Sequence, residues 1–331
     1  MTGSETEPPT TFDELRSTTP SLDWIWLDGE FVRWDEARVH VLSHGLHYGT
    51  GVFEGVRCYT TDAGPAIFRW PSHLDRLFRS AAIYDLDVPY ARDSLTAAAQ
   101  ELVRRQDLSD CYLRPIIFAG ADRLDIDPTG LRTRVAIAAW PFGRYLGTDA
   151  LETGIDVTVS SWRRIGGDQV PTTAKATGPY VNSVLATREA ARNGYDEAVM
   201  LTADGQVAEG PGETLFLVRD DTLHTPALAH DVLPGVTRRT VVALARDLGY
   251  AVDSEATIGR GELLTADELF FAGTAAEVTP IRSVDGTPVG SGEPGPVTTA
   301  LRDRFFDVVH GRIDGYANWR TPVSPPISRH P

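Results

Sequence analysis

A single lysine, Lys175, lies in the segment VPTTAKATGPYVNS over residues 170–183. Of the 31 lysine and arginine residues in the chain, all the others are arginine. Arginine supplies a fixed charge, whereas a lysine shielded from water can lose its proton and attack a carbonyl carbon to form a Schiff base. The alternative is one leftover lysine on a solvated surface. A phosphate-binding loop is excluded here, because Lys175 stands between two alanines and not in GxxxxGK[ST].

Two short segments are candidates for binding the phosphate of an aldehyde cofactor. The commonest such cofactor on a protein lysine is pyridoxal phosphate. In LPGVTRR a Pro-Gly pair precedes a predicted helix, which leaves the N–H groups of Val236 and Thr237 free for an anion. In AGTAAEVT the small residues 273–275 let backbone N–H groups approach a ligand closely. Each pattern alone is also typical of an ordinary helix start or a tight turn.

A carboxylate beside the ring nitrogen of such a cofactor would keep that nitrogen protonated and make the ring a stronger electron acceptor. The segment AEGPGE supplies Glu209 and Glu213, with glycine and proline restricting the backbone between them. A surface turn with two solvated carboxylates is the alternative.

The composition predicts a folded, ordinary globular protein. The chain has 331 residues, of which 42% are hydrophobic and 23% charged, enough for two domains with buried cores. Its net charge of -15 argues against nucleic acid and anionic membranes as partners. The first residues do not resemble a signal peptide and no apolar run is long enough to span a bilayer, so we expect a cytoplasmic protein.

Histidine and cysteine patterns predict neither a metal site nor a disulfide. His44 and His47 in SHGLHYG have i, i+3 spacing, but no nearby cysteine or HExxH pattern supports a metal, so we expect structural roles. Cys58 and Cys111 lie in apolar, strand-like runs without a CxxC pattern, which predicts reduced thiols in the core.

Periodicity divides the chain into two α+β units. Residues 1–20 are rich in Thr, Ser, Pro and Glu and are expected to form a flexible arm. We expect a smaller α+β domain over 21–140, an interdomain link over 141–154, and a larger α+β domain over 155–331. The larger domain contains the lysine and both candidate anion-binding segments, so it is the expected cofactor-binding domain.

Shorter patterns predict the elements that position the candidate residues. WIWLDGEFVRW predicts a hairpin around Asp28-Gly29, and RVHVL over 38–42 predicts a strand. A helix is expected from Pro71, and further helices from about 93 to 106 and from about 180 to 193. GVTRRTVVALARDLGY predicts an amphipathic helix directly after the first anion-binding segment.

Five segments resemble, in the same order, the class IV pyridoxal-phosphate enzymes, and in particular the branched-chain amino acid aminotransferases. They are HGLHYGTGVFEGVRCY, AKATGPYVNS, AEGPGETLF, LPGVTRR and FFAGTAAEVTPIRSVDG. The match runs from about Trp24 to about Trp319. It implies a two-domain α+β protein of fold type IV, with mixed sheets, packed helices and the active site between the domains.

The resemblance implies ping-pong transamination with pyridoxal 5'-phosphate. The amino group of L-leucine, L-isoleucine or L-valine would pass through a Schiff base on the cofactor to 2-oxoglutarate, giving branched 2-oxo acids and L-glutamate. Small amino acids and 2-oxo acids are thus the implied partners, in amino-acid biosynthesis. A homodimer or a larger homo-oligomer is also implied.

The same resemblance implies a role for each matching residue. Lys175 is similar to the Schiff-base lysine and proton shuttle, Glu209 to the partner of the ring nitrogen, and Tyr180 to the group near the ring hydroxyl. The implied phosphate-binding residues are Arg76, Val236, Thr237 and Thr274. The implied substrate-binding residues are Tyr48, Phe53, Gly55, Arg57, Tyr112, Arg114, Tyr145, Thr274 and Ala275.

Within the implied substrate pocket, Tyr112 and the backbone of Thr274 and Ala275 would receive the substrate carboxylate. Arg114 is the candidate for the second carboxylate of glutamate, and aromatic walls suit the apolar side chains. A structural ion pair is the alternative for Arg114, and a plain surface position is the alternative for Arg76.

Three positions depart from the branched-chain pattern and leave the substrate open. Thr177 and Pro179 stand where many branched-chain enzymes have glycine and asparagine, and Phe142 stands where a tryptophan is common. A D-amino acid aminotransferase, an aminodeoxychorismate lyase and a specialised biosynthetic aminotransferase are therefore alternatives within the family. A non-catalytic cofactor-binding protein is the alternative of a different class.

Overall fold

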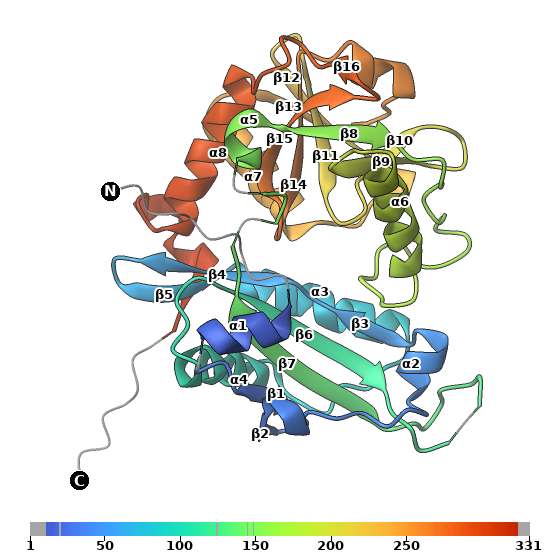
Figure 1. Cartoon of the computed structure of the whole chain (residues 1–331), viewed down its shortest axis with the longest axis vertical. Coiled ribbons are helices and arrows are strands. Elements are labelled where there is room, and N and C mark those ends of the chain that lie inside the picture. The colour runs from blue at the N-terminus through green and yellow to red at the C-terminus, as the bar shows by residue number, and fades with distance from the viewer. Residues whose placement is uncertain (1–10, 20, 124, 144, 148, 324–331) are drawn as a thin grey trace.

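The computed structural model describes residues 11–19, 21–123, 125–143, 145–147 and 149–323. Figure 1 shows two β-sheets with packed helices, one sheet built mainly from the first half of the chain and the other from the second half. This architecture confirms the predicted α+β class with two sheets.

The first sheet is antiparallel, in the order β17-β5-β4-β6-β7-β1-β2, with β3 beside β6. Its strands are β1 (Trp24–Leu27), β2 (Glu30–Arg33), β3 (Gly51–Phe53), β4 (Val56–Thr61), β5 (Gly64–Phe68), β6 (Cys111–Ala119), β7 (Thr133–Pro141) and β17 (Arg320–Pro322). The predicted hairpin is confirmed, because β1 and β2 pair around Asp28 and Gly29, whose φ angles of 48° and 98° suit a two-residue turn.

Helices α3 (Trp70–Ile83) and α4 (Arg92–Arg105) pack on one face of this sheet. On α3, the buried Leu74, Leu77 and Ala81 recur at helical spacing and join a core with the strands, as predicted. Because side chains alternate along a strand, every second residue of β6 and β7 faces the opposite side of the sheet, where it lines a broad apolar groove.

Part of the expected flexible arm is a helix, α1 (Phe12–Thr18). It begins with a capping box, in which Thr11 and Glu14 exchange side-chain to backbone hydrogen bonds of 2.9 and 3.2 Å. The ring of Phe12 packs against Trp34 and Trp140, with centroid separations of 5.3 and 5.7 Å. Local composition gave no sign of these long-range aromatic contacts, and the flexibility of the arm stays a prediction. Residues 1–10 and 20 lie outside the described residues.

The strand predicted over 38–42 does not form. The backbone turns there instead, since Arg38 N donates to Glu36 O at 2.7 Å and Ser43 N donates to His40 O at 2.9 Å. The apolar residues that suggested a strand stay exposed, Val41 at 67%. A short helix, α2 (His44–Tyr48), follows them and leads into β3.

The second sheet is mixed, in the order β10-β9-β8-β15-β14-β11-β12-β13, with β16 beside β15. Its strands are β8 (Ile155–Val159), β9 (Glu197–Leu201), β10 (Val207–Glu209), β11 (Thr214–Arg219), β12 (Thr222–Pro226), β13 (Ala251–Ala256), β14 (Glu268–Gly273), β15 (Glu277–Val284) and β16 (Thr287–Pro288). The pairs β8–β9, β8–β15 and β12–β13 are parallel, which agrees with the mixed sheets that the resemblance implies.

The helices that accompany the second sheet are α5 (Ala150–Thr153), α6 (Tyr180–Arg192), α7 (Val236–Asp247) and α8 (Pro296–Val309). Short 3-10 helices are η1 (Trp34–Glu36), η2 (Leu228–His230), η3 (Arg260–Leu264) and η4 (Asp314–Trp319). Helices α6 and α7 match the predicted ones.

One hydrophobic cluster joins the two halves of the chain. Tyr59 and Phe68 of the first sheet pack in it with residues of α7 and α8 such as Val241 and Phe305. Strand β17, from the far end of the chain, pairs with β5 in the first sheet. The boundaries at 21–140, 141–154 and 155–331 stay a prediction.

Candidate active site

One cavity is lined by residues from both halves of the chain. All the residues that the resemblance assigns to a cofactor line it: Arg76, Lys175, Tyr180, Glu209, Val236, Thr237 and Thr274. Part of the substrate set lines it too: Gly55, Tyr112, Thr274 and Ala275. Arg76 projects from α3, Tyr180 begins α6, and Glu209 ends β10, so the fold brings distant segments together.

Lys175 is half-buried on a segment that is anchored on both sides. Its N–H donates to Ser80 Oγ of α3 at 3.0 Å, and its carbonyl accepts from Phe53 N at the end of β3 at 2.9 Å. Its amine donates to Tyr180 Oη and lies 5.0 Å from the ring centroid of Phe53. The lysine is therefore not a leftover surface residue, and its amine faces the cavity.

The residues after Lys175 pair with β3 and with the residues just before it. Thr177 N donates to Gly51 O and Thr177 Oγ1 to Gly49 O, both at 2.8 Å. Gly49 has a φ of 67°, and a Cβ on it would lie 2.6 Å from Cα of Gly178, so this crossing requires glycine. Thr177, which departs from the family pattern, thus stabilises the lysine segment. Pro179, the other departure, precedes α6 and lines the cavity.

Glu209 is buried and held by two partners. Arg164 Nη2 lies 2.8 Å from its Oε1, and Leu233 N donates to its Oε2 at 3.2 Å. Burial raises the pKa of Glu209 above its ordinary value, and the Arg164 guanidinium opposes that rise. The ion pair fixes the carboxylate at the wall of the cavity.

Glu213 lines the same cavity but has different neighbours. Gly212 N donates to its Oε2 at 3.0 Å. Burial and the nearby carboxylates of Glu197 and Glu209 raise the pKa of Glu213 to about 8, so it carries a proton at neutral pH. Of the two carboxyl groups in AEGPGE, Glu209 with its arginine partner is the one suited to face a positive charge. Neither belongs to a solvated surface turn.

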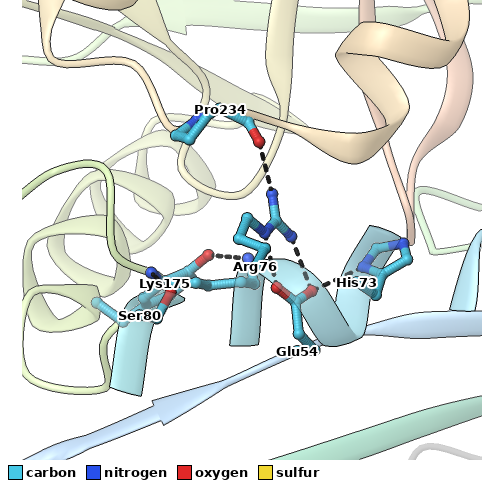
Figure 2. A network of polar contacts seen from close by, with 7 residues as sticks. Glu54, His73, Arg76, Ser80, Lys175 and Pro234 are labelled. Carbon is cyan, nitrogen blue, oxygen red and sulfur yellow. Dashed lines mark hydrogen bonds and ion pairs between the residues drawn. The ribbon is translucent and has the colours of Figure 1, made fainter. Parts of the chain in front are cut away.

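The start of α7 leaves backbone N–H groups free at the wall of the cavity. The helix begins after Gly235, so the N–H groups of Val236 and Thr237 have no acceptor within it. Arg76 Nη1 donates to the carbonyl of Pro234 at 3.2 Å, which places a buried guanidinium at the same turn (Figure 2). An anion here would meet helix N–H groups and a positive charge together. Arg76 is therefore not a surface arginine.

Gly55 lets a tyrosine reach the cavity. A Cβ on Gly55 would lie 1.7 Å from Tyr112 Oη, so a larger residue would displace the phenol. The ring of Tyr112 packs against Trp140 and Phe142 at centroid separations of 5.2 and 4.8 Å. Phe142, the third departure from the family pattern, therefore forms part of the wall behind Tyr112.

Arg114 lies beside the aromatic wall and not in an ion pair. Its guanidinium carbon is 4.8 Å from the ring centroid of Phe53 and 5.3 Å from that of Tyr112. Its Nε is buried without a hydrogen-bond partner. In the described part of the chain no carboxylate forms an ion pair with Arg114. The alternative interpretation of this residue, a structural ion pair, therefore has no support there.

Arg57 is bound by protein groups in a small recess that it shares with Thr237 and Thr274. Its Nη1 donates to Gly143 O at 2.9 Å, and its Nη2 lies 3.6 Å from Glu277 Oε1. Its guanidinium also lies over the ring of Phe142, 5.1 Å from the centroid. Arg57 thus holds the segment that carries Phe142 against the site.

Tyr48 and Tyr145 do not line the main cavity. Tyr48 is 47% exposed at the end of α2, with its ring 4.6 Å from that of His44. Tyr145 is 50% exposed and borders a neighbouring recess together with Ala275. The substrate roles of these two tyrosines stay predictions.

Sequence reasoning missed two charged residues of the site, Arg164 and Glu54. Arg164 pairs with Glu209, and Glu54 pairs with Arg76. Arg164 stands in SSWRRIGG, where nothing in the local pattern distinguishes it from a surface arginine. Glu54 stands inside the motif GVFEGVR, and a carboxylate between two apolar strands was the signal that could have found it.

The remaining predictions concern thiols, metals and membranes. Cys58 and Cys111 are buried and free, as predicted, and face each other across β4 and β6. In the described ranges no group of three His, Cys, Asp or Glu side chains could hold a metal ion. Among the described helices none is long and apolar enough to cross a membrane.

A family model and several known proteins are similar to this chain. The model of the family described as amino-transferase class IV matches residues 51–284. A branched-chain-amino-acid aminotransferase of Pseudomonas aeruginosa is 48% identical over 299 residues, which cover 90% of this chain and 97% of that protein.

Two solved structures are similar to this chain over most of its length. The crystal structure of the Escherichia coli branched-chain amino acid aminotransferase has a TM-score of 0.90 at 46% identity, covering 92% of this chain and 100% of that one. The branched-chain amino acid aminotransferase from Thermobaculum terrenum, in its PLP-form, has a TM-score of 0.85 at 37% identity, covering 92% and 99%.

Proposed function

The chain belongs to the amino-transferase class IV family, and from this premise we propose that it is a branched-chain amino acid aminotransferase. It transfers the amino group of L-leucine, L-isoleucine or L-valine to 2-oxoglutarate with pyridoxal 5'-phosphate as cofactor, giving branched 2-oxo acids and L-glutamate. The observation that carries the proposal is a single cavity where the only lysine of the chain meets a paired carboxylate, a buried arginine and a helix N-terminus.

The residues around the cavity fit pyridoxal 5'-phosphate. An amine, an anion-binding turn and a carboxylate with its own arginine partner are the groups that this cofactor requires. Glu209 would hold the ring nitrogen and Tyr180 the ring hydroxyl. The phosphate would bind to Arg76, Thr274 and the N-terminus of α7. When bound, the cofactor supplies a carbonyl carbon for the amino group and a ring that accepts electrons.

Lys175 Nζ is the group proposed to move the proton. Its backbone is fixed by Ser80 and Phe53, so only the side chain swings. Tyr180 Oη holds the amine by a hydrogen bond. From this place Nζ would remove the proton from the α-carbon of the amino acid, and return a proton later in the half-reaction.

The substrate would bind between the aromatic wall and the β14–β15 loop. Phe53, Tyr112 and Phe142 offer apolar surface for a branched side chain. The backbone of Thr274 and Ala275 would receive the α-carboxylate. Arg114, with a buried Nε that lacks a partner, would receive the second carboxylate of 2-oxoglutarate.

We further propose a homodimer or larger homo-oligomer in the cytoplasm. The apolar groove on the first sheet has a volume of about 590 Å³ and includes Ile116, Phe118, Trp140 and Leu46, the last 64% exposed. Exposed apolar surface of this extent is typical of an interface between subunits. Arg114 also lines the groove, so a second copy covering it would close the substrate side of the site. The cytoplasmic location is proposed from the family's place in amino-acid metabolism.

A panel of amino donors tests the proposed function. The purified protein with pyridoxal 5'-phosphate is assayed with L-leucine, L-isoleucine, L-valine and D-alanine against 2-oxoglutarate, and separately with aminodeoxychorismate. We expect kcat/KM to be highest for the three branched-chain donors. Preference for D-alanine or aminodeoxychorismate would assign the chain to another member of the family. Bound cofactor without turnover of any of these donors would leave a specialised biosynthetic aminotransferase or a non-catalytic protein.

A further inference from the structure

Glu54 has no role in the mechanism described so far, yet it forms a buried polar network with two residues of α3. It lies between β3 and β4 and is 0% exposed. Its Oε1 accepts from Arg76 Nε at 2.6 Å, and its Oε2 accepts from Arg76 Nη2 at 2.8 Å and from His73 Nδ1 at 2.7 Å. Figure 2 shows Glu54 between the two side chains of α3, with Arg76 extending on to Pro234.

The two bonds to Glu54 determine which edge of the Arg76 guanidinium stays free. A guanidinium has five N–H donors. Two of them bind Glu54 and one binds the Pro234 carbonyl, which leaves one on each Nη. The free donor on Nη2 belongs to the Nη1–Nη2 edge, which points away from Glu54, and Arg76 lines the cavity beside Thr237 and Thr274. Donors on this edge of an arginine can bind phosphate oxygens.

The charges of the network balance. Burial lowers the pKa of His73, so its ring is neutral and Nδ1 donates a hydrogen to Glu54. Burial opposes ionisation of Glu54, yet Arg76 and His73 lower the pKa of its carboxyl to about 2. Glu54 therefore stays ionised at neutral pH and compensates the charge of Arg76. Without it, a buried guanidinium would lack its counter-charge and its fixed orientation.

Glu54 also connects the groups around it to Lys175. His73, Arg76 and Ser80 share one face of α3, at i, i+3 and i+7, and Ser80 binds the Lys175 backbone. The neighbour of Glu54 on one side, Phe53, binds the Lys175 carbonyl. The neighbour on the other side, Gly55, lines the cavity. A single carboxylate thus ties α3 to the β3–β4 connection at the base of the site.

We propose that Glu54 is a positioning residue for the phosphate end of the cofactor site. It acts through Arg76, by holding the free edge of the guanidinium toward the cofactor phosphate. This inference rests on the proposed phosphate-binding role of Arg76.

The test compares the binding of pyridoxal 5'-phosphate with that of pyridoxal, which lacks the phosphate, by absorbance titration of the cofactor-free protein. The ratio of the two dissociation constants measures recognition of the phosphate alone. We expect Glu54→Gln to lower the preference for the phosphorylated form by about tenfold or more, with the affinity for pyridoxal changed by less than about threefold. Glu54→Asp, which keeps the charge, should recover part of the preference.

Glu268→Gln is the matched control. Glu268 is also a buried glutamate, but it binds the first residues of α8, where Val297 N donates to it at 2.9 Å and Thr298 N at 2.7 Å. It does not line the cavity. This variant should lose stability and keep the wild-type ratio. If Glu54→Gln likewise keeps the ratio while Arg76→Gln lowers it, Glu54 is only a core ion pair and the inference is wrong.

Two further variants separate this inference from the function on which it rests. If Arg76→Gln keeps the wild-type ratio, the proposed role of Arg76 itself is wrong. The double variant Glu54→Gln/Arg76→Gln removes both buried charges, so it can fold even where the single Glu54 variant does not. Its ratio should equal that of Arg76→Gln, because Glu54 acts only through Arg76. A ratio clearly lower than that of Arg76→Gln would overturn the inference.

Discussion

Glu209 and Glu213 are four residues apart and both line the cavity, yet their neighbours act on their pKa values in opposite directions. Arg164 supplies Glu209 with a counter-charge, whereas Glu213 has the carboxylates of Glu197 and Glu209 nearby. Keeping Glu213 protonated leaves one negative group in this part of the wall and avoids repulsion between two buried carboxylates. The difference between the two carboxyl groups depends on Arg164 and Glu197, which local sequence patterns do not connect to them.

Glu213 should make the stability of the cofactor-free protein fall as the pH rises. Its pKa is about 8 in the fold against an ordinary 4.5, so between these values the folded state holds a proton that the unfolded chain has lost. We expect Glu213→Gln, which cannot titrate, to flatten this dependence, with a difference in slope of up to about 1.4 kcal/mol per pH unit. Urea unfolding of both proteins at pH 5.5, 6.5 and 8 measures it, and parallel curves would contradict the protonated state.

Lys175→Arg should keep the thermal stability of the protein and abolish its turnover. Arginine can still donate to Tyr180 Oη, so the variant should melt within a few degrees of the wild type by circular dichroism. It cannot lose its proton, so turnover should fall by at least about a thousandfold. Borohydride reduction with cofactor should attach a pyridoxyl group at Lys175 in the wild type, as peptide mass spectrometry would show. Labelling elsewhere, or an active variant, would refute the role of this lysine.

At the scale of elements, the site depends on a crossing of two chain segments. Residues 175–178 run beside residues 49–53, and backbone hydrogen bonds link the lysine segment to β3. Gly49 and Gly178 approach at the centre of this crossing. The position of Lys175 is therefore set by backbone pairing and does not rely on its own side-chain contacts.

Gly49→Ala should disrupt this crossing. The new Cβ would lie 2.6 Å from Cα of Gly178, a backbone atom that cannot move aside alone. Gly64→Ala is the matched control, because Gly64 also has a positive φ, 101°, but a Cβ added there would have nothing within 4 Å. We expect Gly49→Ala to cost about 1–3 kcal/mol more than the control in chemical unfolding, and to lower kcat/KM. Equal costs would mean that the crossing tolerates a side chain.

Elements with strong periodicity could be predicted from the sequence, and the groups that orient the site residues could not. Helices α3 and α7 follow from regular apolar spacing, and the β1–β2 hairpin from its Asp-Gly turn. The strand expected over 38–42 failed because alternating apolar residues also suit an exposed surface. The roles of Glu54 and Arg164 were not predicted, because their partners lie 22 and 45 residues away along the chain. The partner of Glu54 is in α3 and the partner of Arg164 is in β10. Local patterns carry no information on such pairings.

At the scale of the whole molecule, the apolar groove of the first sheet lies close to the substrate side of the site. Arg114 borders this groove, and Phe53 lies between Arg114 and Tyr180. A surface that covers the groove would also determine how much water reaches the substrate side. Assembly and catalysis are therefore expected to depend on the same face.

Leu46→Asp should weaken self-association. Leu46 is 64% exposed and lines the groove, so a buried charge there would oppose contact with a second copy. Light scattering after gel filtration should give a multiple of 36.1 kDa for the wild type and a shift toward the mass of one chain for the variant. Leu264→Asp, at an exposed leucine outside the groove, is the control and should keep the wild-type mass. A wild type of one-chain mass would exclude the proposed oligomer.

The pairing of β17 with β5 has a consequence for how the protein is made. On the ribosome, β5 emerges long before its outer neighbour, Arg320–Pro322. Until β17 has been synthesised, the edge of the first sheet is therefore open, and open edges pair with other strands. The first half of the chain can collapse earlier, but its sheet is complete only after β17 has emerged. A chain truncated after α8 would lack β17, and the unpaired edge of β5 would be prone to aggregation.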